Sequence, residues 1–265
     1  MTDPASLPLM ALEGVGLAYP DGRVALADID LAIHQGERLV LLGTNGSGKS
    51  TLLKLLDALV LPTTGRYRFD ARAIDAATAR DGEWNRQFRR RVVLMFQQPE
   101  AMLFNATVAE EIGYGLRHLP ADERAARIEA WARRLRLLDH LDTPPFELSG
   151  GEKQRLCLAC LLAVEPEVLL LDEPTANLDP RTAGWLLDWL AERHITSVIA
   201  THQLALAGEL GRRLVILSEQ HSVAYDGPIE SGLADLALLL AHGLAHEHRH
   251  QHGSASHRHV HSHDW

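Results

Sequence analysis

The sequence has few cysteines, no long apolar run and no excess of positive charge, and each absence excludes a class of protein. Two cysteines in 265 residues are too few for the disulfide framework of a small secreted domain. The longest uninterrupted apolar run, residues 156–164, is far shorter than the roughly 18 residues that indicate a membrane-spanning helix. A formal net charge of −9 argues against binding of nucleic acid through phosphate neutralisation. We therefore expect no nucleic-acid partner.

The rest of the composition is that of an ordinary globular protein. Hydrophobic residues make up 46% and charged residues 23% of the chain, which is long enough to bury a sizeable core. The N-terminus has no basic region followed by an apolar stretch, so the sequence predicts no secretion signal and a cytoplasmic location.

Short apolar runs alternate with longer helical patterns up to about residue 240, which predicts βα units around a mostly parallel sheet. Continuous apolar residues at 39–42 and 168–171 are typical of strands that are buried on both faces. Residues 198–200 and 214–217 have the same character. The predicted fold class is therefore α/β.

Two segments depart from this alternation. Between about residues 97 and 164 the pattern becomes helical, which predicts a helical subdomain inserted into the α/β core. After a domain of residues 1–240, residues 241–265 are mainly His, Gly, Ser and Arg with almost no periodic apolar positions. This composition predicts a disordered, His-rich tail without a packed core.

Residues 43–51 fit the pattern G-x-x-x-x-G-K-[ST] between a predicted strand and a predicted helix. Its glycines let backbone N–H groups close around phosphate oxygens, Lys49 brings positive charge to the β- and γ-phosphates, and the Ser50 hydroxyl can bind Mg²⁺. The alternative is a glycine-rich turn with a surface lysine. We predict a P-loop NTPase core that binds ATP and Mg²⁺ through Gly43, Asn45, Gly46, Ser47, Gly48, Lys49, Ser50 and Thr51.

Two carboxylates follow the predicted strand at 168–171, at the sheet edge where open α/β folds bind ligands. Asp172 is the expected Mg²⁺ partner, and Glu173 is placed to accept a proton from the attacking water or to orient it. The alternative is that both are solvated acids after a strand.

Ser149 and Glu152 form the pattern of a capping box, which by itself only predicts a well-capped helix start. Gly150 and Gly151 add bare backbone amides at a helix N-terminus, where the dipole favours an anion. One chain thus carries two phosphate-binding elements, and a symmetric pair of chains, each offering its second element to the other's nucleotide, would use both.

With these motifs, the sequence resembles the nucleotide-binding subunits of ATP-binding-cassette (ABC) transporters over about residues 7–235. The resemblance implies a dimeric ATPase at the cytoplasmic face of the membrane that couples hydrolysis of ATP to transport. It also implies roles for further residues. By this resemblance, Tyr19 stacks on adenine, Gln97 contacts Mg²⁺ and the attacking water and couples to membrane subunits, His202 holds the γ-phosphate, Ser149, Gly150 and Gly151 contact the γ-phosphate across the dimer, and Asp179 lies in the loop that joins the two sites.

Two features depart from the family pattern. Family members often have Gln where this chain has Glu152; since the capping box gives this carboxylate another partner, we expect ATP binding to survive. Cys157 and Cys160 replace small apolar residues. Their C-x-x-C spacing is compatible with a redox or metal site, but their place in an apolar run favours core packing.

Residues 96–112 are similar to the ATPases of energy-coupling-factor importers, and most of all to those of nickel/cobalt uptake systems. This resemblance implies a transmembrane coupling protein and a substrate-capturing membrane protein as partners. The alternatives are an importer of another small substrate such as a vitamin or amino acid, a soluble ABC ATPase that acts on ribosomes or DNA, and a metal-regulated store or sensor.

The tail contains two rows of alternating histidines. In an extended chain, a period of two places each row on one side, and neutral imidazole suits Ni²⁺, Co²⁺, Zn²⁺ and Cu²⁺. The alternatives are a solubilising end or an affinity tag, and metal binding would not make the metal the cargo. The residues predicted to bind a transition metal are His246, His248, His250, His252, His257, His259, His261 and His263.

Overall fold

The computed structural model describes residues 7–252 and 255–262, with side chains over residues 7–245. The strands are β1 (Met10–Ala18), β2 (Val24–Ile33), β3 (Arg38–Leu42), β4 (Thr64–Phe69), β5 (Arg72–Ala73), β6 (Val92–Met95), β7 (Val168–Asp172), β8 (Thr196–Ala200), β9 (Arg213–Leu217), β10 (Val223–Pro228), β11 (Ala245–His252) and β12 (Ala255–Ser262). The helices are α1 (Lys49–Leu56), α2 (Ala76–Arg80), α3 (Gly82–Arg91), α4 (Val108–Tyr114), α5 (Ala121–Arg134), α6 (Gly150–Ala163), α7 (Pro180–Glu192), α8 (Leu204–Leu210), α9 (Ile229–Ala234) and α10 (Leu236–Ala241), with short 3-10 turns η1 (Pro99–Met102), η2 (Leu138–His140) and η3 (Pro145–Glu147).

A six-stranded sheet with the order β10-β9-β3-β8-β7-β6 forms the centre of the molecule. Its strands β6, β7, β8, β3 and β9 are parallel, and β10 pairs with β9 in the antiparallel sense. Leu41 and Asp172 both pair with Ala200, so β3, β8 and β7 end in one row. The four predicted apolar strands all occur, which confirms the α/β prediction.

Alternate residues of the central strands enter two separate cores. Val40 and Leu42 of β3 lie in a core shared with α6, α7 and α8. Leu39 and Leu41 lie in a second core, shared with α1 and with a four-stranded antiparallel sheet of order β2-β1-β4-β5. All four side chains are fully buried. Burial on both faces explains why these strands are apolar throughout rather than alternating.

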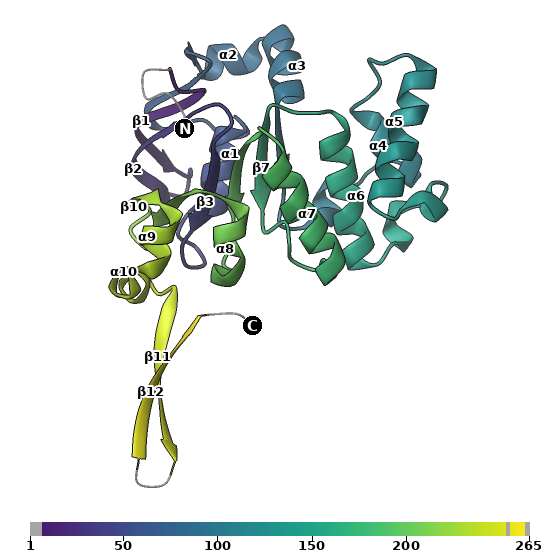
Figure 1. Ribbon diagram of the computed structural model, residues 1–265. Coiled ribbons are helices and arrows are strands. Elements are labelled where there is room, and N and C mark those ends of the chain that lie inside the picture. Colours follow the sequence, from purple (N-terminus) through teal and green to yellow (C-terminus); the bar gives the residue numbers. More distant parts are fainter. Residues whose placement is uncertain (1–6, 253–254, 263–265) are drawn as a thin grey trace.

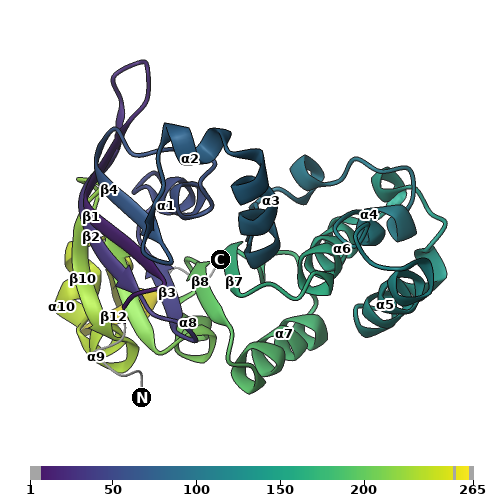
Figure 2. The same ribbon diagram turned by 90° about the horizontal axis from the view of Figure 1, so that it is seen from above.

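Helices α4, α5 and α6 form the inserted helical subdomain between β6 and β7. They lie together at the end of the molecule opposite to β1, β2 and β4 (Figure 2). Trp131 of α5 and Leu156 of α6 are buried in the first core, so the subdomain packs against the α/β body. Helix α6 lies between α7 and the outer helices α4 and α5 (Figure 1), and its buried residues share the first core with β3 and β7.

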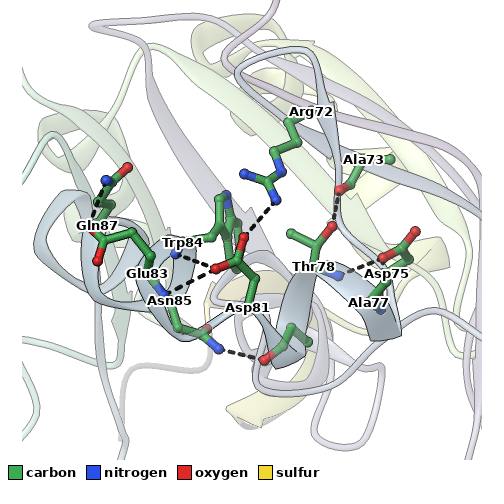
Figure 3. Close-up of polar contacts among 11 residues, drawn as sticks. Arg72, Ala73, Asp75, Ala77, Thr78, Asp81, Glu83, Trp84, Asn85 and Gln87 are labelled. Carbon is green, nitrogen blue, oxygen red and sulfur yellow. Dashed lines mark hydrogen bonds and ion pairs between the residues drawn. The ribbon is translucent and has the colours of Figure 1, made fainter.

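Helices α2 and α3 each begin at an aspartate cap. Asp75 caps α2, and the carboxylate of Asp81 accepts hydrogen bonds from the amides of Glu83 and Trp84 at the start of α3 (Figure 3). The capped helix α3 carries Arg89, whose Nη1 lies 2.6 Å from Oδ2 of Asp57 at the end of α1. This ion pair ties α3 to the C-terminal end of the P-loop helix.

The chain stays packed against the body up to the start of the His-rich segment. Leu239, Leu244 and Ala245 are buried in the first core, so the packed body extends to residue 245 rather than to the predicted boundary at 240. Beyond it, β11 and β12 form an antiparallel hairpin that extends away from the body (Figure 1). This pairing differs from the disordered tail that the composition predicts, and the predicted ligand His263 lies outside the described residues.

We expect Arg89→Met to lower the free energy of unfolding by roughly 2–4 kcal/mol, because Asp57 is left buried without its cation. The side chain of Asp57 is only 6% exposed, and burial raises its pKa to about 7 although Arg89 lowers it. Removal of Arg89 should therefore raise this pKa further. A carboxyl with a raised folded pKa costs stability as the pH rises toward that pKa, so the variant continues to lose stability above pH 7 where the wild type no longer does. The effect of the substitution should thus be larger at pH 8 than at pH 6.

Urea denaturation at both pH values measures this effect. The matched control is Arg86→Met, which removes an exposed ion pair to Glu83 on the same helix and should change the free energy of unfolding by about 0.5 kcal/mol or less. Equal effects of the two substitutions would contradict the assigned role of Arg89.

Candidate functional site

The loop after β3 has the geometry of a phosphate cradle. Gly46 and Gly48 have φ values of +85° and +110°, a backbone region that favours glycine. A Cβ atom on Gly48 would lie 2.5 Å from the carbonyl oxygen of Ala25, so this position also lacks space for a side chain. Among the residues that the structure describes, no side chain caps the first turn of α1, and the buried Ser47 hydroxyl has no hydrogen-bond partner. These free donors fit the oxygens of a triphosphate.

Lys49 is poised beside this loop. Its Nζ donates to the carbonyl oxygens of Gly43 at 2.6 Å and Thr44 at 3.1 Å. Burial lowers the pKa of Lys49, while the charges of Glu173 and Asp172 oppose that shift. The lysine thus stays close to two carboxylates in a partly desolvated site, where its charge acts strongly on an anion.

Asp172 and Ser50 lie together at the ends of β7 and α1. Burial raises the pKa of Asp172, and a hydrogen bond from the Ser50 side chain and the charge of Lys49 oppose the rise. A hydroxyl beside a carboxylate is the oxygen donor set that Mg²⁺ uses in P-loop proteins. The two residues therefore fit the predicted magnesium site.

Glu173 is held at both carboxylate oxygens. His202 Nδ1 lies 2.7 Å from Oε1, and the Thr201 hydroxyl donates to Oε2 at 3.1 Å. Glu173 is 5% exposed and has a φ of +52°, an uncommon conformation for a residue with a side chain. The backbone strain and the two side-chain partners fix the direction of this carboxylate.

Lys49, Asp172 and Glu173 face one cavity of about 770 Å³, a size suited to a nucleotide. Tyr19 lies at its wall, with its hydroxyl 3.2 Å from Thr51 Oγ1 and the Arg23 guanidinium 5.6 Å from its ring centroid. Gln97, at the end of β6, also lines the cavity. The predicted residues that line it are Tyr19, Asn45, Gly46, Gly48, Lys49, Ser50, Thr51, Gln97, Asp172 and Glu173.

A second cavity of about 410 Å³ adjoins the first, and Asn45, Gln97 and Glu173 line both. It is lined by predicted residues Gly43, Asn45, Gln97, Glu173 and His202, and also by Thr44, Gly243 and Leu244. The sequence analysis missed Thr201, Gly243 and Leu244 as site residues. Thr201 adjoins His202 in sequence and could have been found, but no local pattern indicates that residues 243–244 return to the P-loop.

Ser149, Gly150 and Gly151 line neither cavity of the described chain, and neither does Asp179. Ser149 and Gly150 are exposed at the start of α6. The capping box is formed: the Ser149 hydroxyl accepts from the Glu152 amide at 3.4 Å, and the Glu152 carboxylate accepts from the Ser149 amide at 2.8 Å. The Ser149 hydroxyl also donates to the Glu152 carboxylate at 2.6 Å. This bond and the one from the Ser149 amide lower the pKa of Glu152, whose carboxylate also lies near Arg155.

The two cysteines have no partner sulfur and behave as core residues. Cys157 Sγ donates to the carbonyl oxygen of Pro99, and burial raises its pKa to about 12. Burial also raises the pKa of Cys160. Thiols that resist ionisation are poor nucleophiles and poor metal ligands, which favours the packing interpretation.

The arrangement can perform phosphoryl transfer to water. Lys49 and the loop amides can bind the phosphates, Ser50 and Asp172 can hold Mg²⁺, and Glu173 can accept a proton from a water molecule at the γ-phosphate. His202 and Gln97 lie at the same end of the cavity.

Comparisons with known proteins agree with this chemistry. Residues 26–176 match the family described as ABC transporter. A protein of Methanosarcina acetivorans, named as an ABC transporter ATP-binding protein, is 42% identical over 244 residues, which cover 89% of this chain and 88% of the relative.

Two solved structures are similar over most of their length. The first is cbiO1 from Clostridium perfringens, described as part of the ABC transporter complex cbiONQ, with a TM-score of 0.73 and 31% identity over 89% of this chain and 94% of that chain. The second is the dimeric ATP-binding cassette MJ0796 in a post-hydrolysis state with ADP and Pi, with a TM-score of 0.75 and 28% identity over 83% of this chain and 98% of that chain.

We expect Glu173→Gln to bind Mg·ATP while its steady-state hydrolysis falls by about two orders of magnitude or more, because the amide cannot accept the proton. Lys49→Ala should instead lose nucleotide binding, since it removes the charge beside the phosphates. Equilibrium binding of a fluorescent ATP analogue and phosphate release separate the two variants. Wild-type turnover by Glu173→Gln would remove this carboxylate from the reaction.

Proposed function

Because this chain belongs to the ABC transporter family, as an ATP-binding subunit with an ATPase domain, we propose that it drives a membrane importer of energy-coupling-factor type for nickel or cobalt ions. The observation that carries the proposal is a divided site. One cavity collects Lys49, Asp172 and Glu173, while Ser149 lies exposed on another part of the same chain. Two copies that face each other would complete two nucleotide sites.

ABC ATPases work as dimers with transmembrane partners, and a dimeric cassette is among the similar structures. For this chain we propose a homodimer in which Ser149, Gly150 and Gly151 of one protomer contact the γ-phosphate bound by the partner. The exposed, capped N-terminus of α6 supports that role, because its free amides can bind an anion. The loop with Asp179 would lie between the two sites.

Within each site, the proposed roles follow from position. Lys49 and the loop amides bind the phosphates. Glu173 accepts the proton of the attacking water, and Thr201 and His202 orient the Glu173 carboxylate. Tyr19 stacks on adenine at the far end of the cavity. Mg²⁺, held by Ser50 and Asp172 with Gln97 nearby, neutralises the charge of the phosphates when it is bound.

A groove lined in part by the segment that follows Gln97, residues 100–105, supports a membrane partner. It has a volume of about 280 Å³ and is lined by Leu103, Phe104, Phe146 and Lys153, among others. Phe104 is 66% and Phe146 is 78% exposed, which is unusual for large aromatic residues on a free surface. We assign this groove to a cytoplasmic segment of a transmembrane coupling protein, because the same loop that forms it begins at the nucleotide cavity. No described helix is long and apolar enough to span a bilayer.

The cargo rests on likeness alone. The similarity to cbiO1, part of the complex cbiONQ, supports an energy-coupling-factor importer with a separate substrate-capturing protein. Nickel and cobalt remain the proposed substrates. The alternatives are a vitamin or amino acid as cargo, a soluble cassette, and a metal store or sensor, and the following experiment tests the nickel or cobalt cargo against them.

Cells that lack this protein should lose uptake of radiolabelled Ni²⁺ or Co²⁺, and the wild-type chain should restore it while Glu173→Gln does not. The double variant Phe104→Ser/Phe146→Ser should hydrolyse ATP in solution but restore less than about a tenth of the uptake, since burying such aromatics often dominates an interface. Its control, Leu59→Ser, removes an exposed apolar side chain elsewhere. Normal uptake of both metals in cells that lack the protein would refute nickel and cobalt as its transported substrates.

We also propose that the tail binds a transition metal such as Ni²⁺, Co²⁺ or Zn²⁺. The backbone register of the hairpin supports this, because His246, His248 and His250 pair with His261, His259 and His257. Three His–His pairs on alternate positions concentrate imidazole along one short segment. Imidazole is a common ligand of these ions.

A chain cut after Ala245 should retain fewer Ni²⁺ ions in equilibrium dialysis than the full chain while it hydrolyses ATP at a similar rate. The cut leaves Leu244 and Ala245 in place, because both are buried in the core. Equal retention by the two chains would eliminate the tail as a metal site. A lower melting temperature of the cut chain would indicate that the cut damaged the body, and a cut after Gln251 then provides the comparison.

A further inference from the structure

Helix α6 joins two functional parts of the molecule within one chain. Its N-terminus presents Ser149, the proposed contact to the partner's nucleotide, and its next turns pack on the loop that follows β7. Gly151, Gln154 and Arg155 have the spacing of neighbours on one helix face, and each contacts that loop. The helix therefore approaches the loop that carries Glu173 at three positions along this face.

Gln154 makes the central contact. Its side chain is 1% exposed, and its Nε2 donates to the carbonyl oxygens of Glu173 at 3.4 Å and Pro174 at 3.2 Å. Its Oε1 is buried and has no hydrogen-bond partner in the described structure. Burial of an amide with one unsatisfied oxygen is costly, so simple packing does not explain why a polar residue lies here.

The flanking contacts restrict the same loop. A Cβ atom on Gly151 would lie 3.0 Å from the carbonyl oxygen of Asn177, so α6 can approach the loop closely because this residue is glycine. Arg155 Nη1 lies 3.8 Å from Oδ2 of Asp179. The loop itself is strained, with positive φ at both Glu173 and Asn177. Such backbone conformations persist only where the surroundings hold them.

We propose that Gln154 is a positioning residue. In the proposed dimer, α6 of one protomer contacts the ATP that its partner binds, and Gln154 couples the presence of that ATP to the Glu173 carboxylate of its own protomer. The proposal rests on the proposed dimer. When the partner's ATP fixes the N-terminus of α6, the Gln154 amide holds the backbone of Glu173, and the carboxylate stays directed at the water by Thr201 and His202. Each site then hydrolyses fast only while the other site is filled.

Mixed dimers with differently tagged protomers test this coupling. The first protomer keeps an intact P-loop and Glu173, and its hydrolysis is measured. The second carries either Glu173→Gln, which keeps its own site filled with ATP, or Lys49→Ala, which leaves that site empty. The ratio of the two rates measures the coupling between sites, and an allosteric effect of usual size predicts a ratio of about 10.

Gln154→Met in the first protomer should bring this ratio to about 1–2, because methionine fills the same space but donates no hydrogen bond. The same substitution in the second protomer should leave the ratio unchanged, since that protomer's Glu173 does not act on the measured site. This directional difference excludes a general structural effect. Cys160→Ala, on the same helix but without a contact to the loop among those described here, is the stability control.

A ratio that survives Gln154→Met in the first protomer, or a ratio near 1 in the unsubstituted pair, would overturn the proposed coupling. If Gln154→Met lowered the ratio equally from either protomer, Gln154 would support folding rather than coupling between the sites. That result would also overturn the proposed coupling. These outcomes differ from failure of the proposed function, which would be seen as wild-type chains that neither pair nor hydrolyse ATP.

Discussion

Three neighbouring parallel strands end side by side, and the roles proposed for Lys49, Asp172, Glu173 and His202 depend on that arrangement. The register aligns Leu41 of β3, Ala200 of β8 and Asp172 of β7 in one row. The residues that follow these three positions therefore meet at one edge although they are distant in the sequence. Parallel pairing requires a crossover after each strand, so the P-loop, the acidic pair and His202 can come from three separate βα units and still share one cavity.

In the proposed dimer, the same edge is one half of each hydrolytic site. The exposed capping box at Ser149 lies at the start of α6, and the face of that helix next to it contacts the loop after β7. In that dimer, a single helix would contact one nucleotide with its N-terminus and support the other site with its side. Assembly and catalysis would then depend on the same helix.

Features that depend on neighbouring residues could be predicted from the sequence, and features that depend on long-range packing could not. The P-loop, the apolar strands and the acidic pair are local patterns, because burial on both faces and phosphate binding each require particular residue types in sequence. The antiparallel sheet of β1, β2, β4 and β5 escaped prediction, since its strands alternate irregularly around bulges. Thr201 adjoins the predicted His202, but its role follows from a hydrogen bond to Glu173, which comes from the loop after a different strand.

The return of the chain to the nucleotide edge at residues 243–244 is the strongest example of such long-range packing. The amides of Gly243 and Leu244 bond back to the carbonyl oxygens of Leu240 and Leu239, and Gly243 adopts a φ of +65°. This is the usual way in which a helix ends at a glycine. A Cβ atom at position 243 would lie 3.0 Å from Thr44 Cγ2, so the glycine also permits close approach to the P-loop. The His-rich segment therefore leaves the body from the wall of the second cavity, which Gly243 and Leu244 share with Glu173 and His202.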